Sequence, residues 1–377
     1  MDFSWAIHND LSQKGFMKKL RVGVIGATGM VGQTYIKLLN NHPWFEVVYT
    51  AASARSAGKT YKEAVGGRWL MEVDIPAHLE NVVVEDATNI KAAGERCDFI
   101  FSAIETDKKT VREIEDQYAA SGIPVVSNNS AHRHTSDVPM MVAEVNGDHF
   151  DIIPAQRKRY GTKRGFIVVK PNCSVQSYMT PIYALIKAGH PIKEMIVSTM
   201  QAVSGAGYPG VSSMDIIDNI IPYIGGEEEK SEIEPLKILG RVEGSEIRNY
   251  DKIKISAHCN RVSVIDGHMA CVSMKFENSK PSRDEIIEIW NNFKAVPQEL
   301  DLPFAPLRPI IYKTEKDRPQ TRKDRNLDKS MAVSVGRLRD CNVFDYRFVG
   351  LSHNTVRGAA GGGILNAELA KAKGLFD

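Results

Sequence analysis

Short apolar runs and helical patterns alternate along the first part of the chain. Residues 20–25 read as a buried strand, a glycine-rich turn follows, and apolar residues then recur at helical spacing as far as Leu39. A second buried strand is expected at residues 45–50. Because strands that alternate with helices build a parallel sheet covered on both faces, the pattern predicts a Rossmann-like, doubly wound α/β domain. Further strands are expected at 82–84, 99–101, 125–126 and 166–169, and a further helix at 108–120.

The pattern changes in the second half of the chain. Apolar positions at helical spacing predict a long helix over residues 175–186. Two long strands are expected at 252–265 and 268–277, and the Asp266-Gly267 pair between them is a strong signal for a hairpin turn. We therefore expect a second, α+β domain with a mainly antiparallel sheet and covering helices.

The turn after the first predicted strand has the spacing G-x-x-G-x-x-G. Gly26 allows a tight turn, Gly29 lets the backbone approach a pyrophosphate, and Gly32 lets the helix pack close to the strand. The phosphates would bind at the N-terminus of the helix. The alternative is a tight turn that binds no ligand. The position of the glycine motif between a strand and a helix favours a dinucleotide site.

The end of the second predicted strand bears on the choice of cofactor. An NAD site usually carries Asp or Glu there, whereas this chain has Ser53, Arg55 and Ser56, and Glu46 stands at the opposite end of the strand. Arginine makes strong charge-assisted hydrogen bonds to phosphate, so the segment favours NADP over an ordinary polar loop. Ser102 also follows a strand, at the edge where ligands of this fold collect.

Cys173 is the main candidate for catalysis. It stands in Lys170-Pro171-Asn172-Cys173-Ser174, between a predicted strand and a predicted helix. The positive end of the helix dipole favours thiolate over thiol, and a thiolate can attack an acyl carbon. The alternative is a small buried cysteine of the core.

Three further segments carry residues that chemistry could use. His268 follows the predicted hairpin turn and could be a general acid and base, or simply be half-exposed. Arg261 shares the parity of the apolar positions in its strand, so its guanidinium needs an anionic partner, either a protein or a substrate carboxylate. Residues 201–207 are glycine-rich, which suits close approach to a ligand. Residues 227–230 form a charge run of a kind that is usually solvated.

Composition narrows the class of protein. The length of 377 residues suggests two domains, and a formal net charge of +2 gives no electrostatic argument for nucleic acid or membrane partners. The five cysteines form no C-x-x-C pair, so neither a disulfide framework nor a metal site is indicated, and a reducing cytoplasm fits best. Residues 1–19 lack the apolar core of a signal peptide, and we interpret them as an extension before the first strand.

Together these motifs resemble the aspartate-semialdehyde dehydrogenase family, in its archaeal and fungal branch. The resemblance covers the chain from Leu20 to the C-terminus, and the motifs occur in the family's order. They are the glycine turn at Gly26, residues 128–133, Pro171-Asn172-Cys173, and residues 201–207, 227–230, 261–268 and 354–360.

The resemblance implies a role for each motif. Cys173 would be the nucleophile that forms an acyl thioester, His268 its acid–base partner, and Gln201 the residue that orients substrate and thiol. Whether Glu227 or Glu228 binds the substrate ammonium stays open. The implied substrate ligands are Glu227 for the ammonium, Arg261 for the carboxylate, Arg133 and Lys230 for the phosphate, and Asn172. The implied NADP ligands are Gly26, Thr28, Gly29, Met30, Val31, Ser53, Arg55, Ser56, Ser102, Ser204, Gly205 and Asn354.

The activity implied is NADPH-dependent reductive dephosphorylation of L-4-aspartyl phosphate to L-aspartate 4-semialdehyde, in the biosynthesis of lysine, threonine, methionine and isoleucine. The resemblance also implies a homodimer or homotetramer. We expect residues 1–172 with 354–377 to bind NADP, the C-terminal segment folding back onto the first domain, and residues 173–353 to carry catalysis and dimerisation.

Two other functions fit the same scaffold. A malonyl-CoA or succinyl-CoA reductase would share the nucleotide motif, Cys173 and His268, but would not need the charge cluster at 227–230. An NADP-binding regulator without activity would not need Cys173, Gln201 and His268 together. The retained residues therefore favour the phosphorylating enzyme.

Overall fold

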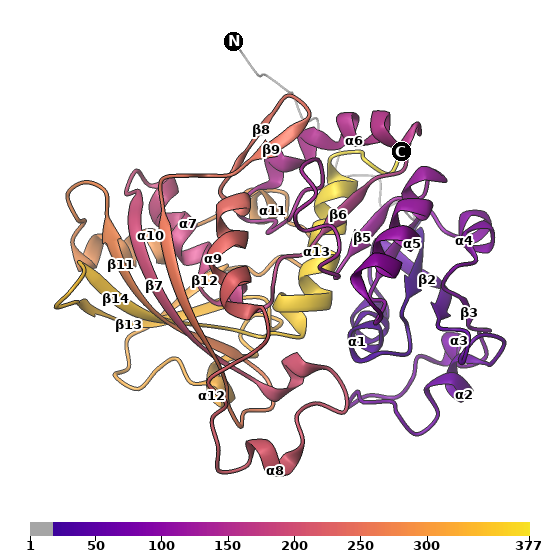
Figure 1. Cartoon of the computed structure of the whole chain (residues 1–377), viewed down its shortest axis with the longest axis horizontal. Coiled ribbons are helices and arrows are strands. Elements are labelled where there is room, and N and C mark those ends of the chain that lie inside the picture. Colours follow the sequence, from indigo (N-terminus) through magenta and orange to yellow (C-terminus); the bar gives the residue numbers. More distant parts are fainter. Residues whose placement is uncertain (1–17) are drawn as a thin grey trace, which may run out of the picture.

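The computed structural model describes residues 18–377, so most of the expected N-terminal extension lies outside the described residues. Two β-sheets lie side by side, one built by the first part of the chain and one by the second (Figure 1). No helix in residues 18–377 combines the length and the hydropathy that crossing a membrane requires.

The first sheet has the predicted parallel, doubly wound architecture. Within residues 18–377 its strand order is β3-β2-β1-β4-β5-β6, and all its strand pairs are parallel. The order reverses between β1 and β4, which is where folds of this type bind ligands at the carboxyl ends of the strands. The strands are β1 (Leu20–Ile25), β2 (Phe45–Ala52), β3 (Glu85–Asp86), β4 (Phe99–Ser102), β5 (Val125–Ser127) and β6 (Ile167–Val169).

Both faces of this sheet are buried, which explains why its strands read as nearly continuous apolar runs. In β4, Phe99 and Phe101 pack into the core on the side of α1, whereas Ile100 packs into the core on the side of α5. The helices of this half are α1 (Met30–Leu39), α2 (Tyr61–Val65), α3 (Ala77–Glu80), α4 (Ile90–Arg96), α5 (Lys108–Ala120), the 3₁₀ helix η1 (Gly147–Ile152) and α6 (Ile153–Tyr160).

The prediction of a strand at residues 82–84 was wrong, because the strand at this place in the sheet is β3, at Glu85–Asp86. The backbone of Val82 and Val84 hydrogen-bonds residues 58–61, and Val83 forms only an isolated bridge to Thr60. These backbone groups are therefore unavailable to β2, which pairs instead with the two residues of β3.

The second sheet is mixed, with antiparallel pairs at its centre. Within the described chain its strand order is β10-β7-β11-β14-β13-β12, and only the two outermost pairs are parallel. A small separate sheet pairs β8 with β9. The strands are β7 (Ile192–Gln201), β8 (Arg241–Glu243), β9 (Glu246–Arg248), β10 (Lys254–Arg261), β11 (His268–Phe276), β12 (Ile310–Lys313), β13 (Val333–Asp340) and β14 (Tyr346–Ser352).

The predicted hairpin between β10 and β11 does not form. Strand β7 lies between them, parallel to β10 and antiparallel to β11, so the segment containing Asp266 and Gly267 crosses over the end of β7. Gly267 does adopt the left-handed φ of 102° that a tight turn favours, which is why the local signal pointed to a hairpin. The insertion of β7 depends on residues far away in the sequence.

The helix expected over residues 175–186 is broken into two pieces. A single 3₁₀ turn, η2 (Ser174–Ser177), ends at Tyr178, whose φ of −137° is not helical, and α7 (Met179–Lys187) then begins. The other helices of this half are the 3₁₀ helix η3 (Val203–Ala206), α8 (Ser213–Ile216), α9 (Glu227–Ile238), α10 (Arg283–Asn292), α11 (Val296–Glu299) and α12 (Thr321–Asp324).

The C-terminal segment returns to the first half of the molecule, as expected. The π-helix η4 (Val356–Ala360) leads into α13 (Gly361–Ala372), and both contact α1, while α13 also contacts β5 (Figure 1). The division of the chain at residues 172 and 353 into two functional domains stays a prediction.

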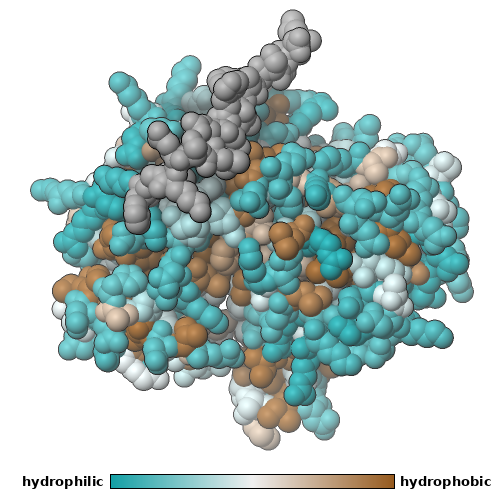
Figure 2. All heavy atoms as spheres, turned by 180° about the vertical axis from the view of Figure 1, so that it is seen from behind, coloured by the Kyte–Doolittle hydropathy of each residue, from teal (hydrophilic) through white to brown (hydrophobic). Residues whose placement is uncertain are grey.

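One segment carries unusually exposed apolar side chains. It surrounds α8 at the lower edge of the molecule, where Figure 2 shows hydrophobic residues on the surface. The exposed side chains are Tyr208, Met214, Ile217, Ile220 and Tyr223.

Candidate active site

The topology of the second sheet brings three predicted site residues to one edge. Gln201 ends β7 and is paired with Arg261, which ends the parallel strand β10. Because β11 runs antiparallel to β7, its first residue, His268, starts at the same edge. The site therefore follows from strand direction rather than from the expected hairpin.

Cys173 lies next to these three residues but comes from the first half of the molecule. It follows β6 and stands immediately before η2, where its Sγ atom lies 3.3 Å from Nε2 of His268. A nucleophile and an acid–base group within hydrogen-bond reach are the basic unit of covalent catalysis. The structure thus brings together two residues that are far apart in the sequence.

Hydrogen bonding fixes the tautomer of His268. Its Nδ1 atom accepts a hydrogen bond of 3.0 Å from the backbone N–H of Ala202. The neutral ring therefore carries its proton on Nε2, the atom that faces the sulfur. Burial, with a smaller contribution from Arg261, lowers the pKa of His268 to about 3, so the ring is neutral at physiological pH. His268 is consequently set as a hydrogen-bond donor to Cys173.

The expected low pKa of Cys173 was wrong for the free protein. Burial, with the Glu227 carboxylate as a smaller cause, raises the pKa of the thiol to about 12, although Arg133, Arg261 and Lys170 act in the opposite direction. The helix that follows is one 3₁₀ turn, which aligns too few peptide dipoles to outweigh desolvation. The thiol is therefore the resting form.

This pKa predicts the pH dependence of Cys173 alkylation in the free protein. Only the thiolate reacts with iodoacetamide, so the rate should rise about tenfold per pH unit from pH 7 to 9 without reaching a plateau. Mass spectrometry of the labelled peptide distinguishes Cys173 from the exposed Cys271. A plateau near neutral pH would instead indicate a thiolate–imidazolium pair.

The pKa shifts of Cys173 and His268 make the stability of the fold depend on pH in opposite directions. The raised pKa of Cys173 stabilises the fold below the ordinary thiol pKa of 9.0, and this contribution is lost as pH rises toward about 12. The lowered pKa of His268 contributes stability above its ordinary value of 6.5, which is lost as pH falls toward about 3.

Glu227 is the centre of a buried polar network. Both of its carboxylate oxygens accept from Nδ2 of Asn172, at 2.8 and 2.9 Å, and it also accepts from Nε2 of Gln201 at 3.2 Å and from Nζ of Lys230 at 2.7 Å. Although burial acts to raise it, these partners hold the pKa of Glu227 below its ordinary value. Glu228 instead accepts from the backbone N–H of Cys259. Glu227, not Glu228, faces the site.

Asn172 serves as a connector within this network. Its Oδ1 atom accepts from the backbone N–H and the hydroxyl of Ser174, at 2.8 and 2.6 Å, while its Nδ2 atom donates to Glu227. The amide of Asn172 thus holds the turn that carries Cys173 in place, because it bonds Ser174 within the turn and Glu227 outside it. Its expected role as a direct substrate ligand stays a prediction.

Arg261 points inward, as its strand parity predicted. It is buried, its Nη1 atom donates to the carbonyl of Ala202 at 2.8 Å, and within residues 18–377 it forms no ion pair with a carboxylate. The alternative of a protein carboxylate partner is therefore not realised in the described chain. Its guanidinium remains available to an anionic ligand, and a Cβ atom on Gly205 would lie 2.8 Å from its Nη1 atom and 3.0 Å from Nε2 of His268.

One pocket of about 440 Å³ joins most of these groups, whereas His268 is fully buried behind Cys173 and does not line it. The predicted substrate and catalytic residues that line it are Arg133, Asn172, Cys173, Gln201, Glu227, Lys230 and Arg261, and the predicted cofactor residues are Met30, Val31, Ser204, Gly205 and Asn354. Asn354 is buried and links two segments of the site. Its side chain accepts from the N–H of Gly267 and donates to the hydroxyl of Ser204.

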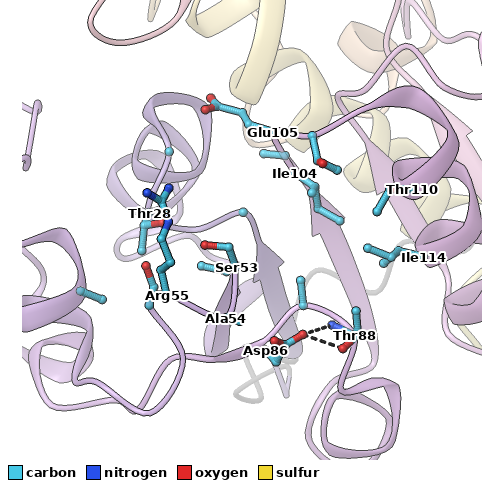
Figure 3. A pocket seen from close by; sticks show the side chains of 18 of the residues that line it. Thr28, Ser53, Ala54, Arg55, Asp86, Thr88, Ile104, Glu105, Thr110 and Ile114 are labelled. Atoms are coloured by element: carbon cyan, nitrogen blue, oxygen red, sulfur yellow. Dashed lines mark hydrogen bonds between the residues drawn. The ribbon is translucent and has the colours of Figure 1, made fainter.

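A second pocket, of about 610 Å³, lies at the carboxyl end of the first sheet (Figure 3). Thr28, Ser53 and Arg55 lie on one side of it and Ile114 on the other. Gly26 has a φ of 80°, and a Cβ atom there would lie 2.1 Å from the carbonyl oxygen of Ala103. The predicted cofactor residues that line this pocket are Gly26, Thr28, Gly29, Ser53, Arg55 and Ser56.

The residues of this pocket fit a dinucleotide with a 2′-phosphate. Gly29 caps α1 without any side-chain hydrogen bond, so the backbone N–H groups of the first turn can bind a pyrophosphate. Within residues 18–377, Arg55 forms no ion pair and can meet a phosphate. Ser102 is fully buried, lines neither pocket and accepts a hydrogen bond from Asn129, and its expected contact with the cofactor stays a prediction.

Comparisons with known proteins agree with this geometry. A model described as semialdehyde dehydrogenase, NAD binding domain, matches residues 21–153, and one described as semialdehyde dehydrogenase, dimerisation domain, matches residues 182–357. Aspartate-semialdehyde dehydrogenase of Schizosaccharomyces pombe is 46% identical over 94% of this chain and 99% of its own. The chain belongs to the aspartate-semialdehyde dehydrogenase family.

Archaeal and fungal members of the aspartate-semialdehyde dehydrogenase family are both similar to it, as the motifs predicted. The Methanothermobacter thermautotrophicus protein is 44% identical over 93% of this chain and 98% of its own. The crystal structure of the Candida albicans enzyme with NADP superposes with a TM-score of 0.87 at 40% identity, covering 95% of this chain and all of that one.

Sequence reasoning missed three residues at this aspartate-semialdehyde dehydrogenase site. Glu234 is buried and contacts both Arg133 and Asn172, Glu105 lines both pockets, and a Cβ atom on Gly358 would lie 2.8 Å from the Cβ atom of Cys173. Helical spacing from Glu227 would have found Glu234, because the two are seven residues apart and share a helix face. No local signal marks Glu105.

Proposed function

We propose that this protein reduces L-4-aspartyl phosphate to L-aspartate 4-semialdehyde with NADPH and releases inorganic phosphate. The observation that carries the proposal is the charge arrangement of the pocket around Cys173. Glu227 offers a carboxylate for the substrate ammonium, Arg261 a guanidinium for its carboxylate, and Arg133 a guanidinium for its phosphate. Three charged side chains thus match the three charged groups of this substrate.

Cys173 carries the covalent step of the proposed mechanism. The sulfur attacks the acyl carbon while the thiol proton passes to the departing phosphate oxygen; the bond from that carbon to the phosphate oxygen breaks, and hydrogen phosphate leaves toward Arg133 and Lys230. When the substrate ammonium pairs with Glu227, it offsets the negative charge that helps to raise the pKa of Cys173, so substrate binding promotes ionisation of the thiol.

His268 acts on the sulfur and on the oxygen that develops charge. Its Nε2–H lies toward Sγ of Cys173, where it stabilises the thiolate and can donate to the oxyanion of the reduced thioester. NADPH, when bound along the glycine turn and Ser204, supplies the hydride that reduces the thioester. The aldehyde leaves when the carbon–sulfur bond breaks, and Cys173 is regenerated.

The leaving group separates this proposal from a coenzyme A reductase. Glu227 lines the pocket, where a substrate ammonium can join its 2.7 Å pair with Lys230, whereas a thioester of malonate or succinate brings no ammonium. The test is NADP reduction with L-aspartate 4-semialdehyde and phosphate, compared with malonic or succinic semialdehyde and coenzyme A. Turnover that needs phosphate supports the proposal, and comparable turnover with coenzyme A contradicts it.

We expect NADP to be preferred over NAD in kcat/KM. Ser53, Arg55 and Ser56 offer donors where an NAD site would carry an acidic side chain, and Arg55 is exposed toward the pocket. Arg55→Ala should lower kcat/KM for NADP about tenfold, because a charge-assisted hydrogen bond is lost. The kcat/KM for NAD should stay nearly unchanged. NAD serves as the internal control, and an equal loss with both cofactors would contradict a contact with the 2′-phosphate.

Assembly and location complete the proposal. The chain matches a dimerisation domain over residues 182–357, and we propose a homodimer or homotetramer. All five cysteines are free, which suits a thiol enzyme of the cytoplasm. Light scattering of the purified protein measures the oligomeric state.

A further inference from the structure

The residues of α9 that face the site form a polar stripe along a single helix face. Glu227, Lys230, Ser231 and Glu234 stand at positions i, i+3, i+4 and i+7, which align on one side of an α-helix. Glu227 and Lys230 belong to the proposed substrate site, whereas Glu234 lines neither of the two pockets described above and is fully buried. A buried carboxylate is costly unless its partners compensate it, so the contacts of Glu234 indicate its role.

Glu234 joins two parts of the site through its two oxygens. Oε1 accepts from Nη1 of Arg133 at 2.9 Å, and Oε2 accepts from the backbone N–H of Asn172 at 2.5 Å. Arg133 is the proposed phosphate ligand, and Asn172 immediately precedes the nucleophile. One carboxylate therefore fixes the phosphate ligand relative to the backbone next to Cys173.

The remaining contacts of Arg133 leave one edge of its guanidinium free. Nε donates to the carbonyl of Lys170 at 2.9 Å, and Lys237, one turn after Glu234 in α9, donates to the carbonyl of Arg133 itself. Within residues 18–377, Nη2 of Arg133 has no protein acceptor, and Arg133 lines the pocket. The guanidinium is thus held on two of its nitrogens and presents the third.

We propose that Glu234 is a positioning residue that sets the distance between the phosphate ligand Arg133 and the nucleophile Cys173. This inference rests on the proposed function and deepens it. Glu234 touches neither substrate nor cofactor and acts through Arg133 and Asn172. A phosphate that leaves the acyl carbon then meets the free edge of a guanidinium already held in place, so the reaction needs no reorganisation of that charge.

Glu234→Gln tests the proposal with little change in shape. An amide has a single acceptor oxygen, so its NH₂ group must face either Nη1 of Arg133 or the N–H of Asn172, and a donor then opposes a donor. In the oxidative direction, with L-aspartate 4-semialdehyde and NADP saturating, we expect the KM for phosphate to rise about tenfold and kcat to fall about 10- to 100-fold. The KM for NADP should change little.

Glu229→Gln is the matched control, because Glu229 lies on the exposed side of the same helix and should keep wild-type kinetics. Circular dichroism checks that each variant folds. If Glu234→Gln does not fold, Glu234→Asp takes its place, because its shorter stem keeps the charge but reaches only one of the two partners, and the same rise in the KM for phosphate is expected.

A double-mutant cycle with Arg133→Ala separates positioning from a merely structural role. If Glu234 acts on phosphate through Arg133, the double variant should have the same KM for phosphate as Arg133→Ala alone. A wild-type KM for phosphate in folded Glu234→Gln, or increases in KM that multiply in the double variant, would overturn the proposal. A wild-type enzyme that does not use phosphate at all would instead refute the proposed function.

Discussion

Cys173→Ser should reduce turnover by roughly 10⁴-fold or more, because the hydroxyl is a far poorer nucleophile than the sulfur it replaces. The side chain is nearly isosteric, so the hydrogen bond to Nε2 of His268 and the packing of η2 should survive. The measurement is kcat in both reaction directions, together with NADP affinity from fluorescence titration, which should be unchanged.

Cys271→Ser is the matched control for this loss. Cys271 is exposed on β11, away from the pocket, and its substitution should leave kcat at the wild-type value. Turnover of Cys173→Ser within about tenfold of wild type would show that no thioester forms at this position.

Arg261→Lys should lower kcat/KM for L-aspartate 4-semialdehyde by about 100-fold, although charge is conserved. A guanidinium can bind a carboxylate with two parallel hydrogen bonds, whereas an ammonium acts as a point charge. Arg261 also donates to the carbonyl of Ala202, and the N–H of Ala202 orients His268. Because lysine has a single donor nitrogen, it cannot hold the substrate carboxylate and the Ala202 carbonyl as the guanidinium does. Misplacement of a bound substrate by about 1 Å can cost 100-fold in rate.

The comparison variant is Arg248→Lys, at an exposed position of β9, where the same substitution should change nothing measurable. Kinetics at saturating phosphate and NADP isolate the effect on the aldehyde substrate. Wild-type kcat/KM in Arg261→Lys would remove Arg261 from the substrate site.

The first sheet could be read from the sequence because each of its signals is local. A buried parallel strand is an apolar run, and the glycine turn needs only Gly26 and its neighbours. The alternation that turned Arg261 inward is equally local, and the structure confirms it. The strand placed at residues 82–84 failed because their backbone groups are taken by a neighbouring loop rather than by a strand.

The site was only partly predictable, because its energetics depend on burial. Residues 227–230 looked like a solvated charge run, yet Glu227 is buried, since a tertiary neighbour, Asn172, donates to both of its oxygens. The lowered pKa expected for Cys173 came from its position in the sequence, whereas desolvation and Glu227 decide the actual direction. Helical spacing places Glu234 on the face of Glu227, but its role could not be predicted because its partners lie 101 and 62 residues away.

The insertion of β7 between β10 and β11 has a consequence for how the enzyme regains activity after denaturation. Strands that adjoin in sequence could pair early through a short loop, but this sheet requires a strand from residues 192–201 to enter between two strands of residues 254–276. Such non-local pairing is slow, because loop-closure entropy is lost before contacts form. Gln201, Arg261 and His268 share an edge only after that step, so in a refolding experiment catalysis should recover with the insertion of β7, after the early collapse of the chain.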